Sequence, residues 1–317
     1  MNLVFLDAST ITRQDLDLTP LANFGPLTLH DLTSPDQVSF RIAGATVAIT
    51  NKVPITDASL AANPGVKLVV SAATGVNQID LDACKARGVM VCNVAGYSTD
   101  SVAQHTFALL LNLVTAVDRY SATCSKDWPA SPFFSRLDHP VTELAGRTLG
   151  IVGLGTIGRA VAKIAEAFGM KVVAFARDHS APDSDIARLS GDAFFKTCDV
   201  ISLHCPLTPQ TQHFINRETL ALMKPTALLL NTGRGPLIDE AALAEALSER
   251  KIGGAGIDVL SVEPPPADHV LLTNDLPNLL ITPHTAWSSH EARQRLLDGI
   301  ISDIQGFLEG TPVNRIV

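Results

Sequence analysis

An apolar run that leads into three closely spaced glycines constrains the fold of this chain most. Residues 148–152 are largely apolar, and Gly153, Gly155 and Gly158 follow in the spacing G-x-G-x-x-G. The first glycine permits a tight turn, the second lets a phosphate approach the backbone, and the third lets a helix pack on the strand. The free N–H groups at the start of that helix then face an anion. The motif therefore predicts a strand–turn–helix unit that binds a dinucleotide pyrophosphate.

The residues around the glycines support this prediction. Apolar residues at 160–165 recur at helical spacing, and Lys171–Phe175 is a second β-rich run, so a βαβ unit of roughly 30 residues is complete. The alternation continues through four further β-like runs: Asp199–Leu203, Ala227–Leu230, Gly254–Val259 and Asn278–Thr282. Strands that alternate with helices are typical of a parallel, doubly wound α/β sheet, which predicts a Rossmann domain.

The first hundred residues predict a separate, smaller α/β unit. Its β-like runs are Leu3–Leu6, Thr46–Ile49, Leu68–Val70 and Val89–Cys92. Polar connections punctuated by Gly and Pro separate these runs, and the helices between them are weakly patterned.

Changes of pattern mark the domain boundaries. A capping box at Ser101 begins a long apolar helix that runs through Val117, and residues 121–146, with three prolines, are predicted to form an irregular arm. A last amphipathic helix spans residues 289–308. The predicted division is a first domain of residues 1–98 and 288–317 and a dinucleotide-binding domain of residues 99–287.

Charge and cysteine content narrow the class of function. The formal charge is −8 and Lys and Arg do not cluster, which argues against a nucleic-acid partner. The five cysteines are scattered and never form C-x-x-C, so neither a disulfide framework nor a metal site is predicted. No signal-like or membrane-spanning segment is evident, so we expect a cytoplasmic protein that acts on small molecules.

The residues after the second strand of the βαβ unit bear on the choice of dinucleotide. A unit that binds NAD usually has an acidic residue about 20 residues past the glycines, where it contacts the ribose hydroxyls. Here Ala176 takes that place, and Arg177 offers a planar fork suited to a 2′-phosphate. This favours NADP over NAD, while Asp178 keeps NAD open and Arg177 is alternatively a solvated charge at the strand end.

Three polar residues follow predicted strands at their carboxyl ends, where open α/β sheets place their ligands. They are Arg234 in NTGRG, Glu263 in SVEP and His284 in TPHTAW. Each residue alone is typical of a solvated loop, but an Arg, a Glu and a His at three such ends together indicate a site. We interpret His105, on the long helix, as a buried histidine with a hydrogen-bond partner rather than a catalytic group.

Several segments carry a family resemblance over nearly the whole chain. They are GLGTIG, HCPLTPQT at 204–211, NTGRG at 231–235, GIDVLSVEP at 256–264 and PHTAW at 283–287. On these motifs the chain resembles the D-isomer-specific 2-hydroxyacid dehydrogenase family, which implies a Rossmann domain and a smaller, flavodoxin-like substrate domain. Trp287, the TNKVPI segment at Lys52 and the VCNVAGYST segment look most like glycerate dehydrogenases that reduce hydroxypyruvate.

The resemblance implies roles for the three strand-end residues. His284 would protonate the substrate carbonyl oxygen during reduction, and Glu263 would orient the imidazole and favour its charged form. Arg234 would grip the substrate carboxylate and polarise the ketone, a bidentate task for which a guanidinium is suited. Backbone N–H groups would help to bind the same carboxylate at Thr74, Gly75 and Val76.

The resemblance also implies a set of cofactor contacts. Besides the glycines and Arg177, these are Thr156 and Ile157 at the pyrophosphate, Pro206 and Thr211 along the adenosine half, and Thr232, Gly233 and Asp258 near the nicotinamide. Asp258 would accept a hydrogen bond from the carboxamide, and its alternative role is to hold a turn.

Together these expectations describe an NAD(P)-dependent reductase. Its substrate would be a small 2-oxo acid, hydroxypyruvate or glyoxylate, and its product the D-2-hydroxy acid, D-glycerate or glycolate. The family further implies a homodimer built by the long helix and the arm. Two other functions stay open: a nicotinamide-sensing, corepressor-like binding protein, and a dehydrogenase of formate or a phosphorus oxyacid.

Overall fold

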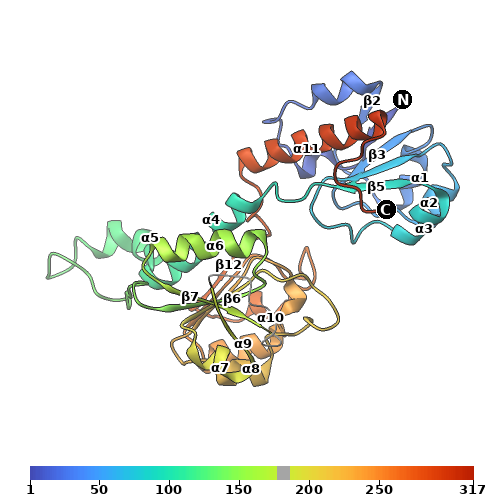
Figure 1. Cartoon of the computed structure of the whole chain (residues 1–317). Helices are drawn as coiled ribbons and strands as arrows, with labels where there is room; N and C mark the ends of the chain where they lie inside the picture. The colour runs from blue at the N-terminus through green and yellow to red at the C-terminus, as the bar shows by residue number, and fades with distance from the viewer. Residues whose placement is uncertain (177–185) are drawn as a thin grey trace. The chain divides into compact units, whose positions relative to one another are not determined.

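A computed structural model describes residues 1–176 and 186–317 and divides the chain into two compact units (Figure 1). Met1–Ser98 and Trp287–Val317 form the first unit, and Thr99–Ala286 form the second. The sequence prediction placed the return to the first unit one residue later, after Trp287. In the structure the Trp287 ring packs edge-on against Tyr97 of the first unit, with 6.4 Å between ring centroids.

A five-stranded parallel sheet in the order β2-β1-β3-β4-β5 forms the centre of the first unit. The strands are β1 Leu3–Phe5, β2 Leu27–Leu29, β3 Val47–Thr50, β4 Leu68–Ser71 and β5 Met90–Asn93. This order is that of flavodoxin-like folds, so the predicted class of the smaller domain is confirmed. Alternate side chains face opposite layers: Leu3 and Phe5 join one core cluster, and Val4 joins the other.

Helices cover both faces of this sheet. They are α1 Val38–Arg41, α2 Asp57–Ala61, α3 Leu81–Arg87 and α11 His290–Glu309, with the 3-10 turns η1 Ala8–Thr10, η2 Thr19–Phe24 and η3 Pro35–Gln37. The C-terminal helix α11, red in Figure 1, lies against the blue strands of this unit. Leu296, Ile300 and Ile304 of α11 pack in one cluster with Leu3 and Phe5 of β1, so the two ends of the chain share one core.

A buried carboxyl group, that of Asp303, lies on the inner side of α11. Its Oδ1 accepts a hydrogen bond of 2.9 Å from Asn314 Nδ2. Among residues 1–176 and 186–317 its Oδ2 has no hydrogen-bond partner, and the residue is 0% exposed. Burial raises the pKa of Asp303 to about 6, although the hydrogen bonds from Asn314 act in the opposite direction. Asp303 therefore stays protonated to a higher pH in the folded protein than in the unfolded chain.

We expect Asp303→Asn to change the pH dependence of stability. Because the folded pKa lies above the usual value of 3.8, the protonated carboxyl stabilises the fold at low pH, and this contribution is lost as pH rises through about 6. The asparagine side chain does not titrate, so the variant lacks this loss. The difference in free energy of unfolding, variant minus parent, should therefore rise by about 2 kcal/mol between pH 4 and pH 8. Urea unfolding at several pH values measures the trend. Asp298→Asn, at an exposed position of the same helix, is the control and should show no such trend.

A seven-stranded parallel sheet in the order β12-β11-β10-β9-β6-β7-β8 forms the centre of the second unit. The strands are β6 Thr148–Val152, β7 Lys171–Phe175, β8 Ala187–Leu189, β9 Val200–Leu203, β10 Leu228–Asn231, β11 Gly254–Ile257 and β12 Leu279–Ile281. Counted from β6, the order 3-2-1-4-5-6 with a seventh strand added is that of the Rossmann fold. The predicted doubly wound sheet is therefore confirmed.

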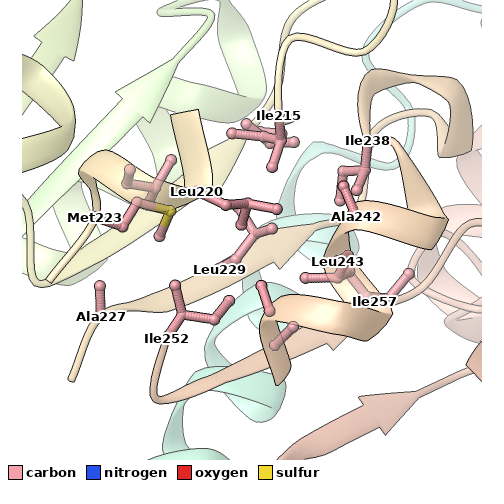
Figure 2. Close-up of a cluster of buried hydrophobic side chains, with 14 of the residues drawn as sticks. Ile215, Leu220, Met223, Ala227, Leu229, Ile238, Ala242, Leu243, Ile252 and Ile257 are labelled. Carbon is pink, nitrogen blue, oxygen red and sulfur yellow. The ribbon is translucent and has the colours of Figure 1, made fainter. Parts of the chain in front are cut away.

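Helices also cover both faces of the second sheet. They are α4 Thr99–Thr115, α5 Val117–Asp127, α6 Thr156–Ala167, α7 Gly191–Thr197, α8 Arg217–Leu222, α9 Glu240–Ser248 and α10 Val270–Thr273, with the 3-10 turn η4 Gly235–Leu237. On one face, Figure 2 shows side chains of α8 and α9, including Leu220 and Leu243, packed on Leu229 and Ile257 of the strands. On the other face, α4 and α6 pack in one cluster with β6.

The arm after α4 differs from its prediction. The predicted long helix through Val117 breaks at Ala116, which has a left-handed φ of +52°, and a separate helix, α5, begins at Val117. Residues 121–127 of this helix were predicted to be irregular. Its apolar residues Val117, Tyr120 and Cys124 recur at helical spacing, so the sequence held a signal for a second helix, although none of the residues of α5 is buried. Within the described ranges, no helix has an apolar stretch of membrane-spanning length.

Candidate active site

The glycine turn between β6 and α6 has the geometry that its spacing predicts. Gly153 has a φ of +97°, and a Cβ there would lie 2.5 Å from the backbone nitrogen of Cys205. A Cβ at Gly158 would lie 2.2 Å from the carbonyl oxygen of Gly153. At Gly155, by contrast, a Cβ would meet no described atom within 4 Å. Gly153 and Gly158 thus allow close packing between backbone segments of the protein. Gly155, in contrast, borders open space.

The N-terminus of α6 begins in that open space. Gly155 is the N-cap and supplies no side-chain hydrogen bond, and Thr156 and Ile157 begin the first turn. The first N–H groups of a helix lack partners within the helix and carry its positive dipole end. The residues present therefore fit a dinucleotide pyrophosphate.

A pocket of about 430 Å³ lies beside the same turn. Its lining residues are Val152, Gly153, Phe175, Cys205, Pro206, Thr208, Gln210, Thr211 and Phe214. The rings of Phe175 and Phe214 meet edge to face at 4.8 Å, and the Thr211 hydroxyl holds its own loop by donating to the Pro206 carbonyl at 2.8 Å. Apolar walls with few polar groups suit a flat aromatic ring. Ala176, at the end of β7, is buried, and Arg177 lies outside the described residues.

We expect Gly155→Ala to weaken dinucleotide binding while leaving the fold intact. The added methyl group meets no protein atom, and the φ of −84° is open to alanine, so the melting temperature should stay close to that of the parent. Crowding at the phosphate should cost about 1–3 kcal/mol, which is roughly a 5- to 150-fold rise in Kd. Fluorescence titration with NADPH and NADH measures this. Gly153→Ala, with its backbone clash, should instead lower the melting temperature. Unchanged Kd values for Gly155→Ala would show that the pyrophosphate lies elsewhere.

Glu263 and His284 form a close pair in the second unit. His284 Nδ1 lies 2.6 Å from Glu263 Oε2, and Glu263 Oε1 accepts a hydrogen bond of 2.9 Å from the N–H of Leu260. An ionised carboxylate only accepts hydrogen bonds, so Nδ1 carries a proton in this pair. The other ring nitrogen, Nε2, is then the atom that can give or take a proton. Both side chains are about one-third exposed, at 29% and 35%.

The turn that carries His284 is held by Asp258. His284 has a left-handed φ of +53°, and its N–H donates to the Asp258 carbonyl at 2.8 Å. The Asp258 carboxylate accepts hydrogen bonds of 2.9 Å from the N–H groups of Thr285 and Ala286 and one of 2.5 Å from the Thr282 hydroxyl. Asp258 is 1% exposed. The carboxylate thus fixes the backbone on both sides of His284.

His105 of α4 adds to this arrangement. Its Nε2 lies 2.9 Å from Thr282 Oγ1 and 3.4 Å from Asp258 Oδ1. Since the single Thr282 hydroxyl hydrogen is directed at Asp258, Nε2 is the donor in the contact with Thr282. His105 therefore has a hydrogen-bond partner, as the sequence interpretation expected, but its side chain is 22% exposed rather than buried.

Arg234 lies in the turn after β10, next to the segment that carries Glu263. Its side chain is exposed, and its Nη1 donates to the carbonyl oxygen of Gly233 at 2.8 Å. A Cβ at Gly235 would lie only 2.0 Å from the backbone of Leu260, so the two turns are in direct contact. Arg234, Glu263 and His284 follow β10, β11 and β12, respectively. Because these three strands are parallel neighbours, the three residues all lie at the carboxyl ends of the sheet strands.

Thr232 and Gly233 of the same turn have partners within the second unit. Thr232 Oγ1 lies 3.1 Å from Thr106 Oγ1 on α4. The N–H of Gly233 donates to Asn231 Oδ1 at 3.0 Å, and Asn231 Nδ2 donates to the carbonyl of Arg234 at 2.9 Å. The Asn231 side chain thus closes the turn on itself and fixes the backbone that precedes Arg234.

In the first unit, two side chains form hydrogen bonds with carbonyl groups of the loop of Thr74, Gly75 and Val76. Ser71 Oγ donates to the Gly75 carbonyl at 2.7 Å, and Asn93 Nδ2 donates to the Thr74 carbonyl at 2.6 Å. Within residues 1–176 and 186–317, the three N–H groups at 74–76 donate no hydrogen bond. A short run of backbone N–H groups left without acceptors is suited to an anion.

Comparisons with known proteins agree with this geometry. A family model described as D-isomer specific 2-hydroxyacid dehydrogenase, NAD binding domain, matches residues 107–286. The chain belongs to this family. The matched segment lies within the second unit, so the unit with the glycine turn is the nicotinamide-dinucleotide domain of a 2-hydroxyacid dehydrogenase.

Individual relatives of this family match the full length of the chain. Glycerate dehydrogenase of Methylorubrum extorquens is 41% identical over 318 aligned positions, which cover 99% of this chain and 98% of that protein. Hydroxypyruvate reductase of Blautia hydrogenotrophica is 38% identical, with coverage of 100% and 99%. Among solved structures, an acyclic imino acid reductase in complex with NADPH and D-Arg matches with a TM-score of 0.87 and 30% identity over 100% of both chains.

Several residues that shape the site of this family member were not predicted. Ser71 and Asn93 are the last residues of β4 and β5, and Thr282 directly follows β12. The rule that selected Arg234 and His284, a polar residue at the carboxyl end of an apolar strand, would have selected all three. Within the described residues, no cluster of three or more His, Cys, Asp and Glu side chains is arranged to hold a metal ion.

Proposed function

We propose that this family member reduces a small 2-oxo acid, hydroxypyruvate or glyoxylate, to the D-2-hydroxy acid with hydride from NADPH or NADH. The observation that carries the proposal is the 2.6 Å contact between Glu263 and His284. This pair and Arg234 lie at the carboxyl ends of neighbouring strands, and the glycine turn of the same unit leaves open space at Gly155 for a dinucleotide. The relatives named glycerate dehydrogenase and hydroxypyruvate reductase support these substrates.

The pair provides the proton that reduction of a ketone needs. With Nδ1 committed to Glu263, Nε2 of the charged imidazole donates its proton to the carbonyl oxygen, and the Glu263 carboxylate stabilises the charge. The bound reduced nicotinamide supplies the hydride to the carbonyl carbon. In the oxidation direction the neutral imidazole takes the proton from the hydroxyl group. His284 and Glu263 therefore act as one acid–base unit.

Two groups are suited to the substrate carboxylate. The guanidinium of Arg234 binds a carboxylate with two parallel hydrogen bonds and draws electrons from the adjacent ketone. The N–H groups of Thr74, Gly75 and Val76, which have no acceptor among the described residues, supply further donors. We assign all four residues to substrate binding.

We further propose that NADP is preferred to NAD. Ala176 stands where an acidic residue would contact the ribose hydroxyls, and the acyclic imino acid reductase was solved with NADPH. Arg177 is the proposed 2′-phosphate contact. The other proposed cofactor contacts are Gly153, Gly155, Thr156, Ile157, Gly158, Pro206, Thr211, Thr232, Gly233 and Asp258.

A homodimer is also proposed, on the basis of the arm after α5. Phe133, Phe134 and Leu137 are 73%, 93% and 90% exposed, which is unusual for adjacent large apolar side chains. Light scattering of the parent and of a Phe133→Ser, Phe134→Ser, Leu137→Ser variant tests this. A monomeric parent would contradict it.

A panel of substrates tests the function directly. Hydroxypyruvate, glyoxylate, pyruvate, formate and phosphite are each assayed with both cofactors by nicotinamide absorbance. We expect the highest kcat/KM with hydroxypyruvate or glyoxylate and NADPH. Turnover of formate or phosphite alone would indicate the oxyacid dehydrogenase, and cofactor binding without any turnover would indicate the sensor; either result would overturn the proposal.

A further inference from the structure

A second cluster of polar side chains contacts the loop that carries Glu263 and includes neither residue of the proposed acid–base pair. It consists of Glu240, the first residue of α9, Ser261, and His269, the N-cap of α10. The Glu240 and His269 side chains are only 12% and 7% exposed. A carboxylate at such depth costs free energy unless it is hydrogen-bonded.

Three donors converge on the Glu240 carboxylate. The N–H of Ser261 donates to Oε1 at 2.8 Å, and the Ser261 hydroxyl donates to Oε2. His269 Nε2 lies 3.1 Å from Oε2, while its Nδ1 accepts a hydrogen bond of 3.3 Å from the N–H of Leu271. Because Nδ1 is an acceptor, the proton of the neutral ring is on Nε2, which donates to Glu240. The carboxylate is thus satisfied without a Lys or Arg partner.

The cluster is connected to the acid–base pair through one short segment of backbone. The Glu240 carboxylate accepts hydrogen bonds from both the N–H and the hydroxyl of Ser261. The Glu263 carboxylate accepts a hydrogen bond from the N–H of Leu260, the residue before Ser261. The other side of this segment is closed by Gly235, where a Cβ would lie 2.3 Å from the Ser261 nitrogen. The segment of residues 260 and 261 therefore has a fixed place between Glu240 and Gly235.

The position of this segment decides where the Glu263 carboxylate lies. One oxygen of Glu263 is bound to Leu260 and the other meets His284 at 2.6 Å, so a shift of the segment moves the carboxylate relative to the imidazole. Proton transfer is sensitive to such shifts, since misplacement by about 1 Å can cost on the order of 100-fold in rate.

We propose that Glu240 is a positioning residue, which holds the segment of residues 260 and 261 so that Glu263 orients His284 for proton transfer. The inference rests on the proposed function of the Glu263–His284 pair. Glu240 touches neither substrate nor cofactor in this scheme. It acts through Ser261 and Leu260 on Glu263.

Glu240→Gln tests the proposal. Its amide NH2 group would face donors from Ser261 and His269, so the segment is expected to shift. We expect kcat for the 2-oxo acid to fall about 10-fold or more, with the Kd for NADPH within twofold of the parent value. The control is Glu245→Gln on the same helix, where the carboxylate makes exposed ion pairs with Arg217 and Lys251 and should leave kcat unchanged.

A double-mutant cycle separates positioning from a purely structural role. Glu263→Ala removes the group that Glu240 is proposed to place, so adding Glu240→Gln to that variant should cause no further loss of kcat. Losses that multiply, or an unchanged kcat in Glu240→Gln, would overturn the inference. Should Glu240→Gln fail to fold, Ser261→Ala, which keeps the backbone contact, carries the same cycle. If Glu263→Ala itself keeps the parent kcat, the proposed acid–base pair fails instead.

Discussion

Replacing His284 with asparagine should lower kcat for reduction of the 2-oxo acid by about 10²- to 10⁴-fold, the usual contribution of a general acid. The amide cannot donate a proton to the carbonyl oxygen, so the hydride transfer would leave an alkoxide without a proton donor. Asparagine tolerates the left-handed φ of +53° at this position better than other residues, so the turn should be kept. Cofactor Kd should stay near the parent value, because no proposed cofactor contact is removed.

A second histidine provides a matched control for this variant. His213 is also left-handed, with a φ of +50°, and it is exposed in a loop of the same unit. His213→Asn should leave both kcat and cofactor Kd unchanged. Steady-state kinetics and fluorescence titration of both variants distinguish the role of the imidazole from that of the backbone. A parent-like kcat in a folded His284→Asn variant would contradict the assignment.

The fold was predictable because its signals are local. Most strands of the second unit are short apolar runs, and the glycine spacing identifies β6 and α6 without reference to the rest of the chain. The edge strand β8 was not predicted, because its three residues include Arg188 and none of them is buried. Helix α5 was not predicted, although Val117, Tyr120 and Cys124 recur at helical spacing, because the three prolines within residues 121–146 favoured an irregular segment. The segment from 177 to 185 contains Arg177 and lies outside the described residues, so the choice of NADP still rests on the sequence.

The partners of the site residues were harder to predict than the residues themselves. Glu263, Arg234 and His284 follow strand ends, and a family resemblance singles them out. Glu240 and Ser261, however, are 21 residues apart, and Asp258 and Thr282 are 24 apart. Their contacts depend on which strands are neighbours and on how the connecting helices return, which no local pattern encodes.

Arg234→Ala should produce the other large effect, and it should appear in both substrate affinity and rate. The guanidinium is proposed to bind the carboxylate in the ground state and to stabilise negative charge on the carbonyl oxygen in the transition state. Loss of such a donor costs about 3–4 kcal/mol, or roughly 10²- to 10³-fold in kcat/KM. KM for the 2-oxo acid should rise and kcat should fall, whereas cofactor Kd should be unaffected.

Arg234→Lys tests whether geometry or charge is responsible. An ammonium group keeps the positive charge but lacks the planar fork, so kcat/KM should lie between the values of the parent and of Arg234→Ala. Arg217→Ala, at an exposed residue paired with Glu245 on the same unit, should leave the kinetics unchanged. Since the Arg234 turn contacts the Leu260 backbone through Gly235, the melting temperature of each variant must also be measured. Parent-like KM and kcat in a folded Arg234→Ala variant would remove this residue from the substrate site and leave the carboxylate to the N–H groups of residues 74–76.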